Sequence, residues 1–223
     1  KDLGSSLLFF TVFVAMLYMA TERSAYVIVG IVLFAAAAVI AYSAFSHVQL
    51  RVDTWLDPWA DWQNRGYQLV QSLFALGSGG LSGQGLGLGR PDLIPNAATD
   101  FVFSAIGEEL GLYGTVAVVM AFLLLIGSGF RIAVQATRAF PKLLAGGLTT
   151  IVGIQMFVIV GGVIRVIPLT GVTLPFVSYG GSSLVANFVI LGLLLRISDE
   201  TALEAQDAAE REARVAEPVG SPT

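Results

Sequence analysis

Five long, apolar runs with few charges constrain the fold of this sequence more than any other feature. Hydrophobic residues make up 55% of the 223 positions, and charged residues only 13%. Crossing the hydrocarbon core of a bilayer takes about 20 apolar residues, and the backbone there must satisfy its hydrogen bonds internally. We therefore predict an all-α polytopic membrane protein. Its five transmembrane helices are expected at about residues 4–20, 25–45, 100–126, 143–166 and 176–197.

The acidic residues cluster at one end of the chain. Seven of the sixteen fall within residues 199–223, and the rest of the chain is close to neutral. There is no basic patch, so nucleic acid is not an expected partner. There is also no cysteine, which excludes disulfide and thiol chemistry. We predict a membrane domain at residues 1–198 and an acidic cytoplasmic tail at 199–223, which passes from a frayed helix into disorder.

The cationic residues predict which ends of the helices face the cytoplasm. Short segments after the first, third and fifth runs carry Arg23, then Arg131, Arg138 and Lys142, and finally Arg196. The positive-inside rule places these segments in the cytoplasm. The loop at 46–99 and the connector Pro168–Pro175 are then outside. Arg51, Arg65 and Arg90 in the long loop argue weakly against this topology, but aspartates accompany them and long loops follow the rule poorly.

The loop at 46–99 has two unusual compositional features. It holds Trp55, Trp59 and Trp62, a density typical of an anchor at the membrane interface. It also contains the glycine-rich segment Gly77–Gly89, which lacks the lysine and the preceding strand of a phosphate-binding P-loop. Two interpretations of this segment stay open. It is a tight loop that needs positive φ angles, or its free N–H groups face an anionic ligand.

Three carboxylates, Asp100, Glu108 and Glu109, stand at the start of the third run. An ionisable residue inside a membrane segment is a candidate for function. Asp100 is either a catalytic carboxylate or a helix N-cap. On a helix, Glu108 lies about 80° from Asp100 and Glu109 about 180° away, so only Glu108 is expected to reach the same cavity. The alternative for the two glutamates is a buried, hydrogen-bonded structural pair.

Further polar residues fall at the same outer face on this topology. Arg165 either binds a diphosphate in bidentate fashion or neutralises a buried glutamate. The serines of Ser178–Ser183 have no histidine at a spacing in the sequence that would indicate a catalytic pair, so a Ser-His-Asp hydrolase is not expected. The glycines of this motif favour close helix packing over substrate contact. The candidate substrate-binding residues are Glu108, Arg165, Ser178, Tyr179, Gly180, Gly181, Ser182, Ser183, Gly79 and Gly80. Together they suit an anionic lipid that carries sugar or phosphate.

Several motifs, in order along nearly all of residues 1–200, also resemble one known family. They are Lys1–Leu7, Leu56–Asp61, Gly66–Ser72, Gly77–Gly80, Ala98–Phe101 with Gly107–Gly111, and Leu174–Leu184. In these stretches the sequence is similar to the SEDS family (shape, elongation, division and sporulation), which includes RodA, FtsW and SpoVE. The ending Leu194–Asp199 looks more like actinobacterial RodA members than FtsW members.

This resemblance implies a fold and an activity. SEDS members have ten spans, and the chain resembles their C-terminal half. Because it also starts inside a motif, at Lys1, we expect a piece of a longer protein that is inactive alone. SEDS members are peptidoglycan glycosyltransferases of the bacterial plasma membrane. With a class B penicillin-binding protein, they polymerise lipid II into glycan strands at the outer face.

The resemblance also assigns a site residue. The essential aspartate of the family falls on Asp100, whereas Ala98 stands where members usually have histidine, so that histidine is not required in every member. No cofactor is certain, although Asp100 would suit a divalent cation beside the diphosphate of the substrate. Two other functions stay open: a transporter of the lipid-linked precursor, and a scaffold that activates a penicillin-binding protein. Transporters more often show internal repeats and broken helices, and the sequence shows no repeat.

Overall fold

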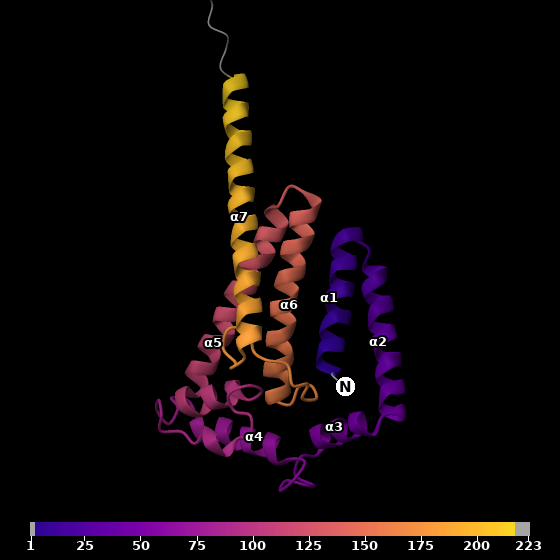
Figure 1. Ribbon diagram of the computed structural model, residues 1–223, viewed down its shortest axis with the longest axis vertical. Coiled ribbons are helices and arrows are strands. Elements are labelled where there is room, and N and C mark those ends of the chain that lie inside the picture. The colour runs from indigo at the N-terminus through magenta and orange to yellow at the C-terminus, as the bar shows by residue number, and fades with distance from the viewer. Residues whose placement is uncertain (1–2, 217–223) are drawn as a thin grey trace, which may run out of the picture.

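The computed structural model describes residues 3–216, and every regular element in that range is helical (Figure 1). The helices are α1 (Leu3–Thr21), α2 (Ser24–Ala44), α3 (Ser46–Leu56), α4 (Tyr67–Gly79), α5 (Val102–Gln135), α6 (Ala139–Val163) and α7 (Gly181–Ala216), with a short 3₁₀ helix, η1 (Pro91–Leu93). Of these, α1, α2, α5, α6 and α7 are long and apolar enough to cross a membrane. The predicted all-α architecture with five candidate spans is confirmed.

The five long helices run roughly along one axis, and α3 and α4 lie across one end of the bundle (Figure 1). Helix α6 packs against both α5 and α1, and α2 packs against α1 at the side. Small residues permit these contacts. A Cβ atom at Gly129 of α5 would lie 2.2 Å from the Thr149 hydroxyl of α6, and one at Gly30 of α2 would lie 2.9 Å from Val14. The turns α1–α2 and α5–α6 lie at the end of the bundle opposite α3 and α4 (Figure 1).

Helix α5 differs from the prediction of one regular span at 100–126. It continues to Gln135, and it is broken at Gly111, where φ is 66° and ψ is −160°. This backbone conformation favours glycine. The break exposes backbone groups, and the glycine-rich loop pairs with them: the Leu112 N–H donates to the carbonyl of Gly80 at 2.9 Å, and the Gln84 N–H donates to the carbonyl of Glu108 at 2.9 Å.

The acidic tail at 199–223 was predicted to pass from a frayed helix into disorder, and in the structure its helical part continues through residue 216. Helix α7 begins at Gly181, later than expected, and continues without interruption to Ala216. Alanine, glutamate and arginine dominate this part of the chain and favour helix. Arg196 also pairs with Glu200 at 2.9 Å, one helical turn on. Residues 217–223, the rest of the predicted tail, lie outside the described residues.

Two other boundaries differ from the prediction. Helix α6 covers 139–163 where 143–166 was expected, because the chain turns at Arg165, which has a φ of 62°. The segment 46–99 was predicted as a long loop, yet it contains α3 and α4. These short helices cover one end of the bundle, and they bring the middle of the segment close to the start of α5.

Candidate functional site

Asp100 lies directly before α5 and faces a cavity of about 270 Å³, called here the Asp100 cavity. Four separate segments form its wall: α3, the start of α4 with the residue two before it, the residues directly before α5, and the connector that follows α6. The lining residues are Leu50, Arg51, Thr54, Trp55, Arg65, Gln68, Leu69, Asp100, Phe101, Leu169 and Gly171. Asp100 is the one carboxylate among them.

The Asp100 side chain does not cap α5. The N-cap residue is Phe101, and no side chain makes a capping hydrogen bond there. Within residues 3–216, the Asp100 carboxylate has no hydrogen-bond or ion-pair partner. Gly171 lies close to the carboxylate, since a Cβ atom added there would lie 3.8 Å from Oδ2. The N-cap interpretation is therefore wrong, and the carboxylate is free to meet a ligand.

The backbone on either side of Asp100 is firmly held. The Ser178 hydroxyl donates to the carbonyl of Thr99 at 2.5 Å, and the N–H of Tyr179 donates to the carbonyl of Ala98 at 2.8 Å. Ser178 is only 2% exposed. On the other side, Phe101 is 1% exposed and belongs to a hydrophobic cluster with Phe103 and Val163.

The rest of the motif at 178–183 does not line the Asp100 cavity. Tyr179 is 77% exposed, and Ser182 is also exposed. The Ser183 hydroxyl bonds to that of Thr173 at 3.0 Å. Among the described residues, neither glycine marks a close helix contact: a Cβ atom at Gly181 would meet nothing within 4 Å, and one at Gly180 would meet Ser183 of the same motif at 3.5 Å.

Two arginines share the cavity with Asp100. Arg51 is on α3, and its Nη1 donates to the carbonyls of Leu169 at 3.1 Å and Thr170 at 3.3 Å. Arg65 lies just before α4 and is largely exposed. The sequence analysis used these arginines only as weak evidence on topology. Their charge and their place among tryptophans were the available signal, but nothing in the spacing linked them to Asp100.

Arg165 holds the end of α3 in this structure. Its Nη2 donates to the carbonyls of Trp55 at 2.9 Å and Leu56 at 3.0 Å, and the indole N–H of Trp55 donates back to the carbonyl of Arg165 at 3.0 Å. The last carbonyls of a helix lack partners within the helix, and Arg165 satisfies them at the end of α3. It does not neutralise a glutamate, and it does not line the Asp100 cavity.

Glu108 lies apart from the Asp100 cavity, contrary to the expectation that it faces the same space. It is 6% exposed, and its Oε1 accepts the backbone N–H of Arg90 at 3.0 Å. Glu108 therefore holds the end of the glycine-rich loop against α5, which agrees with the structural interpretation. Glu109 is partly exposed. It contributes its backbone carbonyl to the contact between the loop and α5, where it accepts the Gly85 N–H at 3.0 Å.

Gly79 and Gly80 belong to the same junction between the loop and α5. A Cβ atom at Gly79 would lie 1.9 Å from the carbonyl oxygen of Gly107, and Gly80 has a φ of 53°. The loop N–H groups of Gln84 and Gly85 already donate to α5. Of the two interpretations of this segment, the structure therefore favours the tight loop over an anion-binding cradle.

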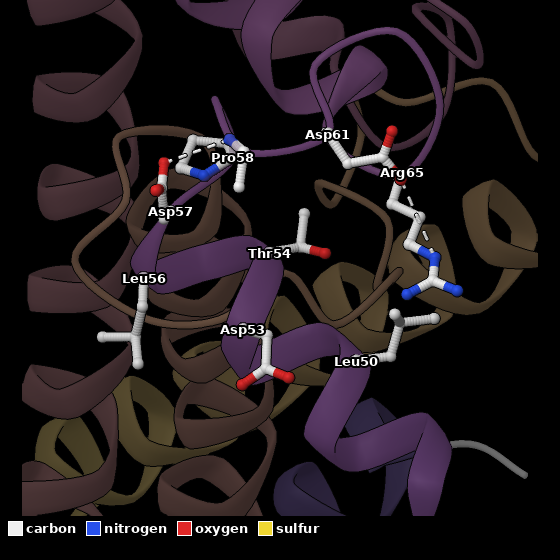
Figure 2. Close-up of a pocket in the computed structure, with 10 residues that line it drawn as sticks. Leu50, Asp53, Thr54, Leu56, Asp57, Pro58, Asp61 and Arg65 are labelled. Atoms are coloured by element: carbon white, nitrogen blue, oxygen red, sulfur yellow. Dashed lines mark hydrogen bonds and ion pairs between the residues drawn. The ribbon is translucent and has the colours of Figure 1, made fainter.

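A second cavity, of about 370 Å³, adjoins the first and shares Leu50, Thr54 and Arg65 with it. Figure 2 shows Asp53, Asp57 and Asp61 around this space, with Arg65 paired to Asp61 at 3.9 Å. Asp57 accepts the backbone N–H groups of Trp59 and Ala60, which stabilises the turn after α3. Within residues 3–216, no three acidic or histidine side chains are arranged to hold a metal ion.

The helices and the site define a class: a multi-pass membrane protein with a single free carboxylate in a cavity at one end of the bundle. A family model described as cell cycle protein, of the FtsW, RodA and SpoVE type, matches residues 1–203. The chain belongs to this family, as the resemblance predicted, and is a multi-pass protein of the plasma membrane.

Individual relatives support the assignment. The chain is 54% identical to the peptidoglycan glycosyltransferase RodA of Mycobacterium tuberculosis, over 89% of this chain and 42% of that protein. It is 50% identical to the RodA of Mycobacterium leprae, over 89% and 43%. It is 41% identical to the probable peptidoglycan glycosyltransferase FtsW of Geobacter metallireducens, over 88% and 53%. The chain thus spans about half the length of the curated relatives it matches.

The fold also has a solved counterpart. A chain from a structure on the coordination of polymerization and crosslinking by a peptidoglycan synthase complex superposes with a TM-score of 0.74 at 30% identity. The match covers 90% of this chain and 56% of that one.

Proposed function

We propose that this chain carries the catalytic carboxylate of a peptidoglycan glycosyltransferase that polymerises lipid II, and that Asp100 is that residue. One observation carries the proposal: a carboxylate without a protein partner shares one cavity with two guanidinium groups, those of Arg51 and Arg65. The names of the relatives support the same activity, since those that cover most of this chain are peptidoglycan glycosyltransferases.

The chemistry of chain growth suits this set of charges. A sugar hydroxyl of the acceptor attacks the anomeric carbon of the donor. A new C–O bond forms, and the bond from that carbon to the lipid diphosphate breaks. Asp100 takes the hydroxyl proton as the attack proceeds. The diphosphate leaves with the bonding electron pair, and guanidinium groups are well suited to hold its oxygens. A divalent cation would supply further charge neutralisation beside Asp100 when bound.

We place the site on the outer face of the plasma membrane. The turns α1–α2 and α5–α6, which carry Arg23 and the basic residues near Arg138, lie at the end of the bundle opposite α3 and α4 (Figure 1). The positive-inside rule puts those turns in the cytoplasm. The Asp100 cavity, which residues of α3 and α4 line, then faces the extracellular side. The sugar-bearing headgroup of a lipid-linked precursor is reached from that side.

A class B penicillin-binding protein is the proposed partner. The matched solved chain comes from a complex described as polymerising and crosslinking peptidoglycan. Crosslinking acts on the peptides of the strand and is a different reaction from glycan polymerisation. A second catalytic subunit is therefore the natural companion of this one.

The transporter alternative gains one supporting observation, the break in α5 at Gly111, since broken helices are typical of transporters. In such transporters the broken backbone lines the substrate cavity. Here the backbone at the break pairs with residues 80–85 of the glycine-rich loop, and Gly111 does not line the Asp100 cavity. We therefore favour the glycosyltransferase.

Asp100→Asn in the complete polypeptide, with its partner, tests the proposal. The change removes the charge and the capacity to accept a proton while it keeps the side-chain size. We expect polymerisation of purified lipid II to fall on the order of 10²-fold or more. Glu109→Gln is the control, because its carboxylate has no place in the cavity. Near wild-type polymerisation by Asp100→Asn protein at normal abundance would refute the assignment. Loss of lipid II translocation with intact polymerisation would favour the transporter.

A further inference from the structure

The position of the Asp100 carboxylate depends on its backbone. Within the described residues no side chain or N–H group holds the carboxylate itself. A general base must lie within hydrogen-bond reach of the proton that it accepts. The accuracy of the site therefore depends on whatever fixes the backbone at residues 98–101.

We infer that Ser178 is a positioning residue, which sets the catalytic position of Asp100 by tying residues 98–99 to the turn before α7. The inference rests on the proposed function of Asp100. It gives the motif at 178–183 a role different from the predicted contact with substrate.

The hydroxyl of Ser178 joins two segments that are far apart in the sequence. It donates its one proton to the carbonyl of Thr99 at 2.5 Å and accepts the N–H of Leu174 at 2.9 Å. The next residue adds a second tie, from the Tyr179 N–H to the carbonyl of Ala98. Because the two bonds hold consecutive carbonyls, they restrict both the position and the rotation of the backbone that leads into Asp100.

The far side of Asp100 is fixed by packing. Phe101 is buried in the cluster that also contains Phe103 and Val163. Asp100 is thus the one residue between a hydrogen-bonded anchor and a hydrophobic anchor, and its side chain is left facing the cavity.

The geometry argues against direct contact between Ser178 and a substrate. A serine hydroxyl has one proton to donate, and the carbonyl of Thr99 takes it. The side chain is also 2% exposed and does not line the Asp100 cavity. Ser178 therefore acts through the backbone of Thr99.

Ser178→Ala in the complete polypeptide tests this role. Loss of the tie to Thr99 should lower kcat on the order of 10- to 100-fold, since small displacements of a catalytic group have effects of this size. KM for lipid II should change by less than about twofold, because no contact with substrate is lost. Ser178→Thr keeps the hydroxyl and should restore most of the rate. Thr173→Val is the matched control, since it removes a hydroxyl from the same connector whose partner is Ser183.

A second measurement reports on the backbone next to Asp100 without an activity assay. Residues 1–223 contain no cysteine, so a nitroxide at Ala98→Cys reports on this segment alone once any cysteine outside these residues is replaced. Its spectrum should show faster motion when Ser178→Ala is added, and no change when Thr173→Val is added.

Several outcomes would overturn the inference. They are an unchanged kcat in Ser178→Ala, a raised KM at unchanged kcat, and an unchanged nitroxide spectrum. If Asp100→Asn is inactive while Ser178→Ala is fully active, the positioning role alone fails. If Asp100→Asn is active, the proposed function fails and this inference with it.

Discussion

At the residue scale, Arg51 combines two tasks at the edge of the Asp100 cavity. One of its guanidinium nitrogens donates to the carbonyls of Leu169 and Thr170, which fixes the connector after α6. The planar guanidinium has further N–H groups, and the residue is exposed to the cavity. A group held on one side and open on the other is well placed to bind a diphosphate.

Arg51→Gln should weaken binding of the lipid-linked substrate. Loss of one charge-assisted hydrogen bond corresponds to about a tenfold rise in KM. The KM of Arg51→Lys should lie between those of the wild type and Arg51→Gln, because lysine keeps the charge but loses the forked geometry. Steady-state kinetics with purified lipid II measures both. Arg90→Gln is the control, because within the described residues its side chain pairs with Asp92 on the surface and does not line the cavity. Equal KM values for the Arg51 and Arg90 variants would rule out the proposed contact.

At the element scale, the break in α5 is where the glycine-rich loop becomes part of the bundle. Gly83 and Gly111 approach so closely that a Cβ atom on Gly111 would lie 2.3 Å from the nitrogen of Gly83. The hydroxyls of Ser72 on α4 and Ser104 on α5, both fully buried, also share a hydrogen bond of 2.6 Å. These contacts hold α4 against α5 and so stabilise the wall of the Asp100 cavity.

Gly111→Ala should therefore destabilise the protein strongly. The new methyl group meets backbone atoms, and alanine disfavours a φ of 66°. We expect a loss of more than about 2 kcal/mol, seen as a lower Tm in detergent. Gly127→Ala on the same helix is the matched control, since a Cβ atom there meets nothing within 4 Å, and helix propensity favours alanine by about 1 kcal/mol. Equal Tm values for the two variants would contradict this account of the break.

At the scale of the whole molecule, the ends of the bundle differ in character. One end holds α3 and α4 (Figure 1), whose residues line the two cavities. At the other end, α7 extends past the turn between α5 and α6. The carboxylate of Glu204 on α7 forms an ion pair with Arg138 at 2.7 Å and accepts a hydrogen bond from the Thr137 hydroxyl at 2.5 Å. This contact links α7 to the turn between α5 and α6.

Single-cysteine labelling checks the proposed orientation in the membrane. We expect Ser82→Cys, in the glycine-rich loop, to react with an impermeant maleimide added to intact cells. Ala139→Cys, at the start of α6, should react only after the membrane is permeabilised. Both positions are exposed, and residues 1–223 contribute no background because they contain no cysteine. Labelling in the reverse pattern would place the Asp100 cavity in the cytoplasm and contradict an extracellular polymerase.

The sequence by itself determined the number of membrane helices, their approximate positions and the family. These follow from local properties: long apolar runs can satisfy their backbone only as helices in a bilayer, and the motifs are contiguous. Asp100 was also identified as a candidate, because an ionisable residue at the start of an apolar membrane segment carries a free-energy cost that usually reflects a function. The helical part of the tail reaches Ala216, further than a frayed end, because alanine and glutamate have high helix propensity.

Only the tertiary structure decided which residues share a site. Arg51, Arg65 and Asp100 line one cavity because α3 and α4 fold across the end of the bundle, and no spacing in the chain encodes that arrangement. Arg165 and Glu108 look like site residues in the sequence, yet their partners are backbone groups of α3 and of the glycine-rich loop. Ser178 likewise bonds to the carbonyl of Thr99. The physical reason is the same in each case. The hydrogen-bond partner of a polar side chain is set by distances across the fold, and a buried polar side chain bonds to the nearest unsatisfied backbone group.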